Sequence, residues 1–300
     1  GPARTGGGDA SAARAHPAGT ALTVRLPDGS AVDCRTRGKL RLEGSKETNP
    51  VAVGDEVEIE PATCTIMEIH PRRNHIVRQS TRKTGHRHVL AANVDQAVLV
   101  VTLREPRTSL GFVDRFLVTC EAFDIPQILV FNKKDLLQSD ELEICKEIMQ
   151  MYEGPNVRTL LLSATVDAAL DPLIEILKGK TSLLAGHSGA GKSTLLNRLV
   201  PGAEQATSEI SDYSSKGVHT TTFAEMFFMG PDTWVIDTPG IKEWGLEDMQ
   251  PSDISGYFPE MHNLRNECRF GGRCLHLEEP QCAVRAAFES GQISASRYSN

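Results

Sequence analysis

Two short stretches decide the fold: "FNKKD" at residues 131–135 and "GHSGAGKST" at residues 186–194. Each follows an apolar run typical of a buried strand, at 126–131 and at 181–186. The second stretch matches the pattern G-x-x-x-x-G-K-[ST] and opens the helical pattern "STLLNRL", which is the context of a phosphate-binding loop. We therefore predict a nucleotide site in which the base-recognition loop precedes the phosphate loop along the chain.

The phosphate loop is expected to bind through its backbone. Its glycines let backbone N–H groups and the helix N-terminus point at phosphate oxygens. Lys192 is expected to hold the β- and γ-phosphates and Ser193 to bind Mg²⁺. The candidate binding residues of this loop are Gly186, His187, Ser188, Gly189, Ala190, Gly191, Lys192, Ser193 and Thr194.

The "NKKD" loop is expected to select the base. Asp135 would accept hydrogen bonds from N1–H and the exocyclic amine of guanine, a donor pair that adenine does not have. Asn132 would position the ring edge, the stem of Lys133 would lie over the ring face, and Lys134 completes the loop. The loop therefore predicts GTP rather than ATP.

The dipeptide Ser163-Ala164 ends the next strand pattern, at 158–164. One strand and one helix separate it from "NKKD", so it fits a turn that presents a backbone N–H to O6 of guanine.

Two further stretches complete the expected site. "DTPG" ends a hydrophobic strand, so Asp237 would hold the Mg²⁺ shell through water and the Gly240 N–H would contact the γ-phosphate. Upstream lies "GVHTTT", in which Thr221 is the first choice as a second Mg²⁺ ligand, with Thr220 and Thr222 as alternatives.

The composition and the pattern of apolar segments along the chain predict a multidomain α/β protein. The 300 residues are 40% hydrophobic and 24% charged, and no run reaches the roughly eighteen apolar residues of a membrane helix, so we expect a cytosolic protein. Short alternating segments predict an OB-like β-barrel, and alternating strands and helices then predict a doubly wound, largely parallel sheet. The expected parts are a disordered tail or residues added for expression (1–17), the barrel (18–84), the nucleotide domain (85–248) and a small helical unit (249–300).

The charge is unevenly placed. The chain has a net charge of −7, yet His70–Leu90 contains no acidic residue and carries +6. This basic stretch predicts one docking face for RNA phosphates; a solvated loop without specific contacts is the alternative.

Three of the seven cysteines cluster near the C-terminus with a histidine: Cys268, Cys274, His276 and Cys282. Three thiolates and one imidazole make a closed tetrahedral set that suits a structural zinc ion. Disulfides are the alternative, which the odd cysteine count and a cytosolic location disfavour.

The motifs NKKD, SA, GHSGAGKST, GVHTTT and DTPG, in that order, resemble those of a circularly permuted GTPase. With the barrel and the Cys/His unit, the chain resembles the family of the ribosome small-subunit-dependent GTPase A over roughly residues 18–298. The resemblance implies a GTP hydrolase that binds the small ribosomal subunit and its rRNA during late subunit maturation. Its pattern also supports zinc at the Cys/His cluster. Members usually have a C-terminal helix that extends beyond "SASRYSN", so we expect the printed sequence to stop within it.

Many GTPases orient the attacking water with a glutamine directly after the glycine of D-x-x-G. This chain has Ile241 there, and an isoleucine cannot do so. The resemblance, together with the chemistry of an imidazole on a loop, indicates His219 as the catalytic residue, and a surface or capping role is its alternative.

Two functions stay open from the sequence. The first is a GTPase stimulated by the small subunit, acting as a monomer without a membrane. The second is a GTP-gated RNA- or protein-binding scaffold with vestigial hydrolysis, and the Ile241 position keeps it open. Asp135 disfavours a third, an ATP-driven enzyme.

Overall fold

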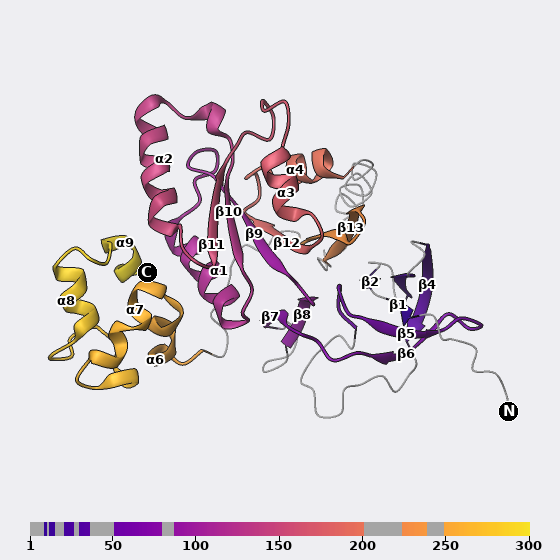
Figure 1. Cartoon of the computed structure of the whole chain (residues 1–300), viewed down its shortest axis with the longest axis horizontal. Helices are drawn as coiled ribbons and strands as arrows, with labels where there is room; N and C mark the ends of the chain where they lie inside the picture. Colours follow the sequence, from indigo (N-terminus) through magenta and orange to yellow (C-terminus); the bar gives the residue numbers. More distant parts are fainter. Residues whose placement is uncertain are drawn as a thin grey trace, which may run out of the picture.

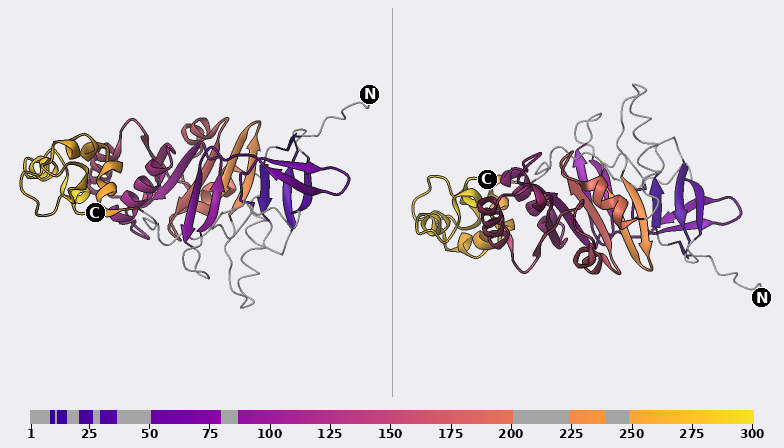
Figure 2. Two further views of the ribbon diagram at one scale, coloured as in Figure 1. Left: turned by 90° about the horizontal axis from the view of Figure 1, so that it is seen from below. Right: turned by 90° about the horizontal axis from the view of Figure 1, so that it is seen from above.

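The computed structural model describes residues 9–10, 12–15, 21–26, 30–36, 51–79, 87–200, 224–238 and 249–300. Three units lie in a row: a first β-sheet, a central sheet covered by helices, and a C-terminal helical unit (Figure 1). Both views in Figure 2 place the central unit between the other two. None of the helices in the described part of the chain is long and apolar enough to cross a membrane.

The central sheet has the strand order β11-β10-β9-β12-β14-β13, and its neighbours are parallel except for the pair β13 and β14. Both β9 and β10 are buried at every position, because helices cover both faces of the sheet. This explains why their sequences are continuous apolar runs. The strands are β9 (Gln96–Val101), β10 (Gln127–Phe131), β11 (Val157–Leu161), β12 (Thr181–Gly186), β13 (Glu225–Gly230) and β14 (Thr233–Asp237).

Two hydrophobic clusters fill the two sides of this sheet. Alternate residues of β9 serve alternate sides: Leu99 belongs to one cluster, whereas Val98 and Val100 belong to the other. Helices α1 (Leu110–Ala122) and α2 (Ser139–Tyr152) complete the first cluster. Helices α3 (Asp171–Leu177) and α4 (Lys192–Leu199) complete the second. The predicted doubly wound sheet is confirmed.

The first sheet has the order β1-β5-β6-β4-β3-β2, with only β4 and β6 parallel. Its core includes Val24, Cys34, Val57 and Ile66. The two outermost strands, β1 and β2, are separated in the chain by Ser11 alone. The strands are β1 (Asp9–Ala10), β2 (Ala12–Ala15), β3 (Ala21–Arg25), β4 (Ala31–Thr36), β5 (Val57–Glu60) and β6 (Thr65–Ile69).

The first and central sheets include two segments that the sequence did not indicate. Residues 9–10 and 12–15, within the tail expected to be disordered, pair with β5 and β3. Strand pairing uses backbone groups, so a Gly/Ala-rich segment is able to join a sheet without apolar side chains of its own. Strand β13 was not predicted at all, and among the described strands it pairs with β14 alone, at the edge of the central sheet.

A two-stranded sheet of β7 (His75–Gln79) and β8 (Arg87–Ala92) links the first sheet to the central unit. Next to it, the guanidinium of Arg72 is buried and donates from Nε to Oδ1 of Asp55 over 2.7 Å and from Nη2 to Oδ2 over 2.9 Å. Arg73 contacts Asp95 over 3.0 Å. Part of the basic stretch therefore holds the fold together, and Arg72 is not available to bind RNA as the sequence suggested.

The C-terminal unit is helical, as predicted. Its short helices are α6 (Pro251–Ile254), α7 (Pro259–His262), α8 (Ala283–Glu289) and α9 (Ala295–Ser299), joined by the 3₁₀ turns η2 (Ser255–Tyr257), η3 (Leu264–Glu267) and η4 (Gly271–Arg273).

A buried ionic network attaches this unit to the central one. Arg297 on α9 is 7% exposed and donates to Asp114 on α1, which is 2% exposed, and to Glu260 on α7 over 2.6 Å. The hydroxyl of Tyr152 on α2 donates to Asp114 over 2.9 Å, and the Arg297 guanidinium lies 4.5 Å from the centre of the Phe258 ring. We call these residues the Arg297 clamp. It joins α9 and α7 to α1 and α2.

Replacing Arg297 with alanine is expected to loosen α7 and α9. Removing one partner of a buried ion pair leaves its carboxylate uncompensated, at a cost of about 3 kcal/mol. Amide hydrogen exchange in α7 and α9 is then expected to accelerate roughly a hundredfold.

The control is Lys146→Ala. Lys146 pairs with Glu143 on the exposed side of α2 over 2.7 Å, and exposed pairs contribute little. Exchange in α7 and α9 should stay unchanged in this variant. Equal protection in both variants would contradict the assigned role of the clamp.

Candidate nucleotide site and Cys/His centre

Four segments that are far apart in the sequence meet at one edge of the central sheet. Asn132 follows β10, Ser163 follows β11, the phosphate loop follows β12, and Asp237 ends β14. Because these strands are parallel, their carboxyl ends lie at the same edge, which is where open α/β sheets bind ligands.

The backbone of the phosphate loop requires glycine. Gly191 has a φ of +97°, and a Cβ built on it would lie 2.2 Å from Nδ2 of Asn132. Gly186, at the end of β12, has a φ of +154°, and a Cβ there would lie 2.9 Å from the carbonyl oxygen of Val100. Helix α4 begins directly after Gly191, at Lys192, so its first N–H groups open toward the loop.

Asn132 joins three loops with one side chain. Its Nδ2 donates to the carbonyl oxygen of Ala190 in the phosphate loop over 2.8 Å. Its Oδ1 accepts from the backbone N–H of Ala164 over 2.9 Å. Because Asn132 is only 4% exposed, both amide atoms depend on these protein partners. The base-recognition loop and the phosphate loop therefore lie side by side despite their reversed order in the chain.

Asp135 and Ser163 also meet. The hydroxyl of the fully buried Ser163 donates to the exposed Asp135 and accepts from the N–H of Val166 over 3.2 Å. The carboxylate expected to read guanine is thus oriented by the dipeptide expected to read O6. Of the backbone N–H groups that this dipeptide offers, that of Ala164 is bound to Asn132, so a guanine that used it would have to share it or take it over.

The two lysines of "NKKD" differ in their partners. Lys133 has a left-handed backbone, with a φ of +64°, and its ammonium donates to the carbonyl oxygen of Glu105. Lys134 pairs with Asp167, with 2.8 Å between Nζ and Oδ1. Sequence reasoning missed Asp167, although an Asp in the turn after a strand is a usual stabiliser of turns.

Lys192 and Asp237 form an ion pair across the phosphate end of the site. Nζ of Lys192 lies 3.2 Å from Oδ1 of Asp237, and the two side chains are 11% and 18% exposed. Burial raises the pKa of the Asp237 carboxyl, whereas the Lys192 ammonium opposes this rise. In the same region Ser193 and Thr194 are exposed on the first turn of α4.

Three predicted site residues lie outside the described residues: His219, Thr221 with its alternatives Thr220 and Thr222, and Gly240. Their assignments remain predictions from the sequence.

His187 of the phosphate loop lies against helix α1. Its ring centre is 3.9 Å from that of Phe112. Burial lowers the pKa of His187, and the nearby Arg115 lowers it further. The neutral ring therefore packs as a partly apolar group between the loop and the helix.

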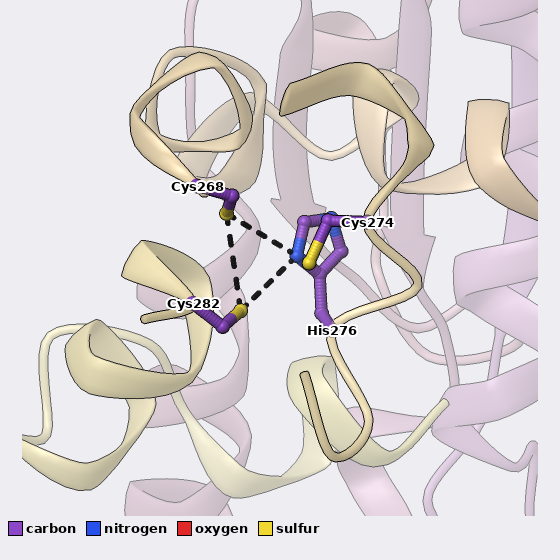
Figure 3. A group of neighbouring side chains, drawn as sticks. All are labelled: Cys268, Cys274, His276 and Cys282. Atoms are coloured by element: carbon purple, nitrogen blue, oxygen red, sulfur yellow. Dashed lines mark hydrogen bonds between the residues drawn. The ribbon is translucent and has the colours of Figure 1, made fainter. Parts of the chain in front are cut away.

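The Cys/His cluster comes together as predicted (Figure 3). All four residues are buried, and their ligand atoms lie within 4.8 Å of one another. The Sγ atoms of Cys268 and Cys282 are 3.8 Å apart, and Nδ1 of His276 lies 3.3 Å from Sγ of Cys282. Thiolates bound tetrahedrally at about 2.3 Å from zinc would be separated by about 3.8 Å. The cluster is therefore compatible with one zinc ion. All seven cysteines are free thiols, which excludes the disulfide alternative in this structure.

A hydrogen bond to Ser255 orients the imidazole of His276. Nε2 of His276 lies 2.9 Å from the hydroxyl of Ser255, so Nδ1 is left to face the thiols. Burial lowers the pKa of His276, which favours the neutral form that a metal needs. Sequence reasoning missed Ser255, since nothing in the spacing of the Cys/His residues points to a serine twenty-one positions away.

Comparisons with known proteins agree with this architecture. The family model described as RsgA GTPase matches residues 69–247. A small ribosomal subunit biogenesis GTPase RsgA from Flavobacterium johnsoniae is 46% identical over 288 residues, covering 94% of this chain and 88% of that protein. One of the same name from Bacteroides fragilis is 46% identical, covering 94% of this chain and 92% of that protein.

Solved structures are also similar. The crystal structure of YjeQ from Thermotoga maritima has a TM-score of 0.76 at 32% identity, covering 97% of this chain and 95% of that one. The structure of YloQ, described as a circularly permuted GTPase, has a TM-score of 0.73 at 26% identity, covering 100% and 94%.

The fold and these matches define the class of protein as a circularly permuted P-loop GTPase. The chain belongs to the RsgA GTPase family.

Gly191→Ala is expected to weaken nucleotide binding at least tenfold. The added methyl group would collide with Asn132 and strain a left-handed backbone, at a cost of roughly 1–3 kcal/mol. This strain would distort the contact between the base-recognition loop and the phosphate loop, and binding would weaken. Titration with GDP measures the effect.

The matched control is Gly179→Ala. Gly179 also has a left-handed backbone, with a φ of +69°, but a Cβ there meets nothing within 4 Å. This variant should lose a similar amount of stability from strain alone and keep its GDP affinity. Equal affinities in the two variants would contradict the close contact of the loops.

Proposed function

We propose that this chain hydrolyses GTP to GDP and phosphate while it binds the small ribosomal subunit and its rRNA, during late maturation of that subunit. The observation that carries the chemistry is the hydrogen bond from Asn132 to Ala190, because it holds the base-recognition loop against the phosphate loop. The biological setting is supported by the relatives, which are named small ribosomal subunit biogenesis GTPases. In this setting the chain would act in the cytoplasm as a monomer.

The position of each residue at the carboxyl edge of the central sheet suggests its role toward the nucleotide. Asp135, held by Ser163, would accept from N1–H and the exocyclic amine of guanine. Ala164 would donate to O6, and the N–H groups of Gly189, Gly191 and the α4 start would surround the phosphates.

The phosphate end of the site also suits a magnesium ion. Ser193, Thr221 and, through water, Asp237 would hold Mg²⁺, which would neutralise phosphate charge when bound. Lys192 now pairs with Asp237, so it would turn from this carboxylate to the β- and γ-phosphates when the nucleotide enters. The Gly240 N–H would contact the γ-phosphate.

Hydrolysis requires a group that orients water, and Ile241 cannot provide it. We propose His219 for this role. An imidazole is able to accept a proton from water or to orient the water by a hydrogen bond.

We further propose that the first sheet closes as an OB-like barrel. In the order β1-β5-β6-β4-β3-β2, the two ends are β1 and β2, which only Ser11 separates. One bent strand pairing with β5 and with β3 would close a five-stranded barrel, an architecture common in nucleic-acid binding. Since Arg72 is buried against Asp55 and Arg73 is paired with Asp95, phosphate contacts would fall mainly to Arg78, Arg82, Lys83 and Arg87 of the basic stretch.

A single structural zinc ion is proposed for Cys268, Cys274, His276 and Cys282. The unit around it has a small core, so metal bonds would supply much of its stability.

Metal analysis of the native protein is expected to find one zinc per chain. Removing it with a strong chelator should unfold the C-terminal unit, seen as rapid hydrogen exchange in α8 and α9, because three buried thiols lose their common partner. Cys274→Ser should lose zinc. Cys64→Ser, at a half-buried thiol in the first sheet, should keep it. Less than stoichiometric zinc in the native protein would overturn this assignment.

Multiple-turnover hydrolysis of GTP and ATP, with and without purified small subunits, tests the proposed function. GTP hydrolysis should be slow alone and strongly stimulated by subunits, and ATP hydrolysis should not respond. His219→Ala should keep GTP affinity and reduce stimulated turnover about 10²- to 10⁴-fold, the usual contribution of a general base.

His262→Ala serves as the control, because this exposed histidine lies on α7 in the C-terminal unit. Unchanged turnover in His219→Ala rules out the catalytic assignment. Tight subunit binding without any stimulated hydrolysis would favour the scaffold function instead.

A further inference from the structure

An arginine on the phosphate-loop helix holds the turn that follows β11. Arg198 lies on α4, and its Nη1 donates to the carbonyl oxygen of Ala164 over 2.9 Å. Its Nη2 donates to the carbonyl oxygen of Ala168 over 3.1 Å. One guanidinium thus bridges the two ends of the turn at 164–168, in a forked geometry that a lysine ammonium is unable to reproduce.

The same turn is held from inside by Asp167. Its Oδ2 accepts from the backbone N–H of Ser163 over 2.9 Å, and its carboxylate pairs with Lys134 of the base-recognition loop. The N–H of Asp167 donates back to the carbonyl oxygen of Ser163 over 3.2 Å.

These contacts leave the Ser163-Ala164 backbone little freedom. Ser163 is bound through its N–H, its carbonyl and its hydroxyl. Ala164 is bound at its N–H by Asn132 and at its carbonyl by Arg198. Both residues are almost fully buried, so these bonds are not exchanged with water.

We propose that Arg198 and Asp167 are positioning residues for guanine recognition, which hold the Ala164 N–H where it reads O6 of the base. This inference rests on the proposed guanine site. A donor that is fixed before binding costs the ligand no ordering free energy, so losing the fixation weakens the contact it makes. Arg198 also lies on α4, which begins at the phosphate loop. It therefore connects the segment proposed to bind the phosphates with the turn proposed to recognise the base.

Three nucleotides separate the possible roles of Arg198. GDP carries both O6 and the exocyclic amine. IDP keeps O6 and N1–H but lacks the exocyclic amine, so it keeps only one of the two contacts expected for Asp135. ADP lacks the guanine pattern and binds through its phosphates and ribose. Dissociation constants for all three are measured by competition against a fluorescent GDP.

Arg198→Ala is expected to weaken GDP and IDP by the same factor, about tenfold, and to leave ADP unchanged. A tenfold loss corresponds to the contribution of one good hydrogen bond to a ligand. Arg198→Lys should lose nearly as much, because one ammonium does not bridge both carbonyls. Asp167→Asn should lose less, since the amide oxygen still accepts from Ser163.

Lys178→Ala is the matched control. Lys178 is an exposed cation that directly follows α3, and its ammonium lies 3.9 Å from the carboxylate of Glu175. It should change none of the three affinities.

Each other outcome overturns the proposal. Equal losses for GDP, IDP and ADP in Arg198→Ala would mean that Arg198 supports the phosphate helix alone. A larger loss for GDP than for IDP would mean that it acts through Asp135, because GDP alone carries the amine that this carboxylate is expected to contact. No loss at all would mean that the turn keeps its shape unaided. If the unaltered protein already binds ADP as tightly as GDP, the guanine site itself fails, and the positioning role fails with it. Unchanged ADP affinity in each variant shows that the fold survives.

Discussion

A single buried amide holds the two halves of the nucleotide site together. Asn132 follows β10, yet both of its polar atoms are bound to the backbone of other loops, at Ala190 and Ala164. A buried amide that lost these partners would cost roughly 1–3 kcal/mol, so the loops are forced to stay in contact. The same contact explains why Gly191 has no side chain. Chain order is irrelevant to this arrangement, because the parallel sheet brings the strand ends together in either order.

Helix α1 extends this constraint toward the C-terminal unit. Near its start, Phe112 packs on His187 of the phosphate loop. Two residues later, Asp114 binds Arg297 and Tyr152. The Cys/His unit is therefore attached to the helix that packs on the phosphate loop, through charges that are expensive to separate. A shift of α1 on nucleotide binding would carry that unit with it.

Periodicity and motif context predicted most of what positions the site. Continuous apolar runs indicated β9, β10 and β12, and the residue types at 268–282 predicted the Cys/His cluster. Strand β13 was missed because "EMFFMG" does not alternate and has no β-branched residue, so its identity depends on its partner β14. The burial of Arg72 depends on Asp55, seventeen residues earlier, and no local sequence pattern predicts such a pair. Arg198 was missed for a similar reason, since its partners are carbonyl groups, which have no sequence signature.

The most direct test of guanine recognition by Asp135 compares the affinities of the unaltered protein and of Asp135→Asn for GDP and xanthosine diphosphate. A carboxylate accepts from the exocyclic amine of guanine, whereas an asparagine amide donates to the carbonyl that xanthine carries at the same position. The account predicts that the unaltered protein prefers GDP and that the variant prefers xanthosine diphosphate, by at least roughly tenfold in each case. A variant that binds GDP as tightly as the unaltered protein, with no gain for xanthosine diphosphate, would show that Asp135 does not face the base.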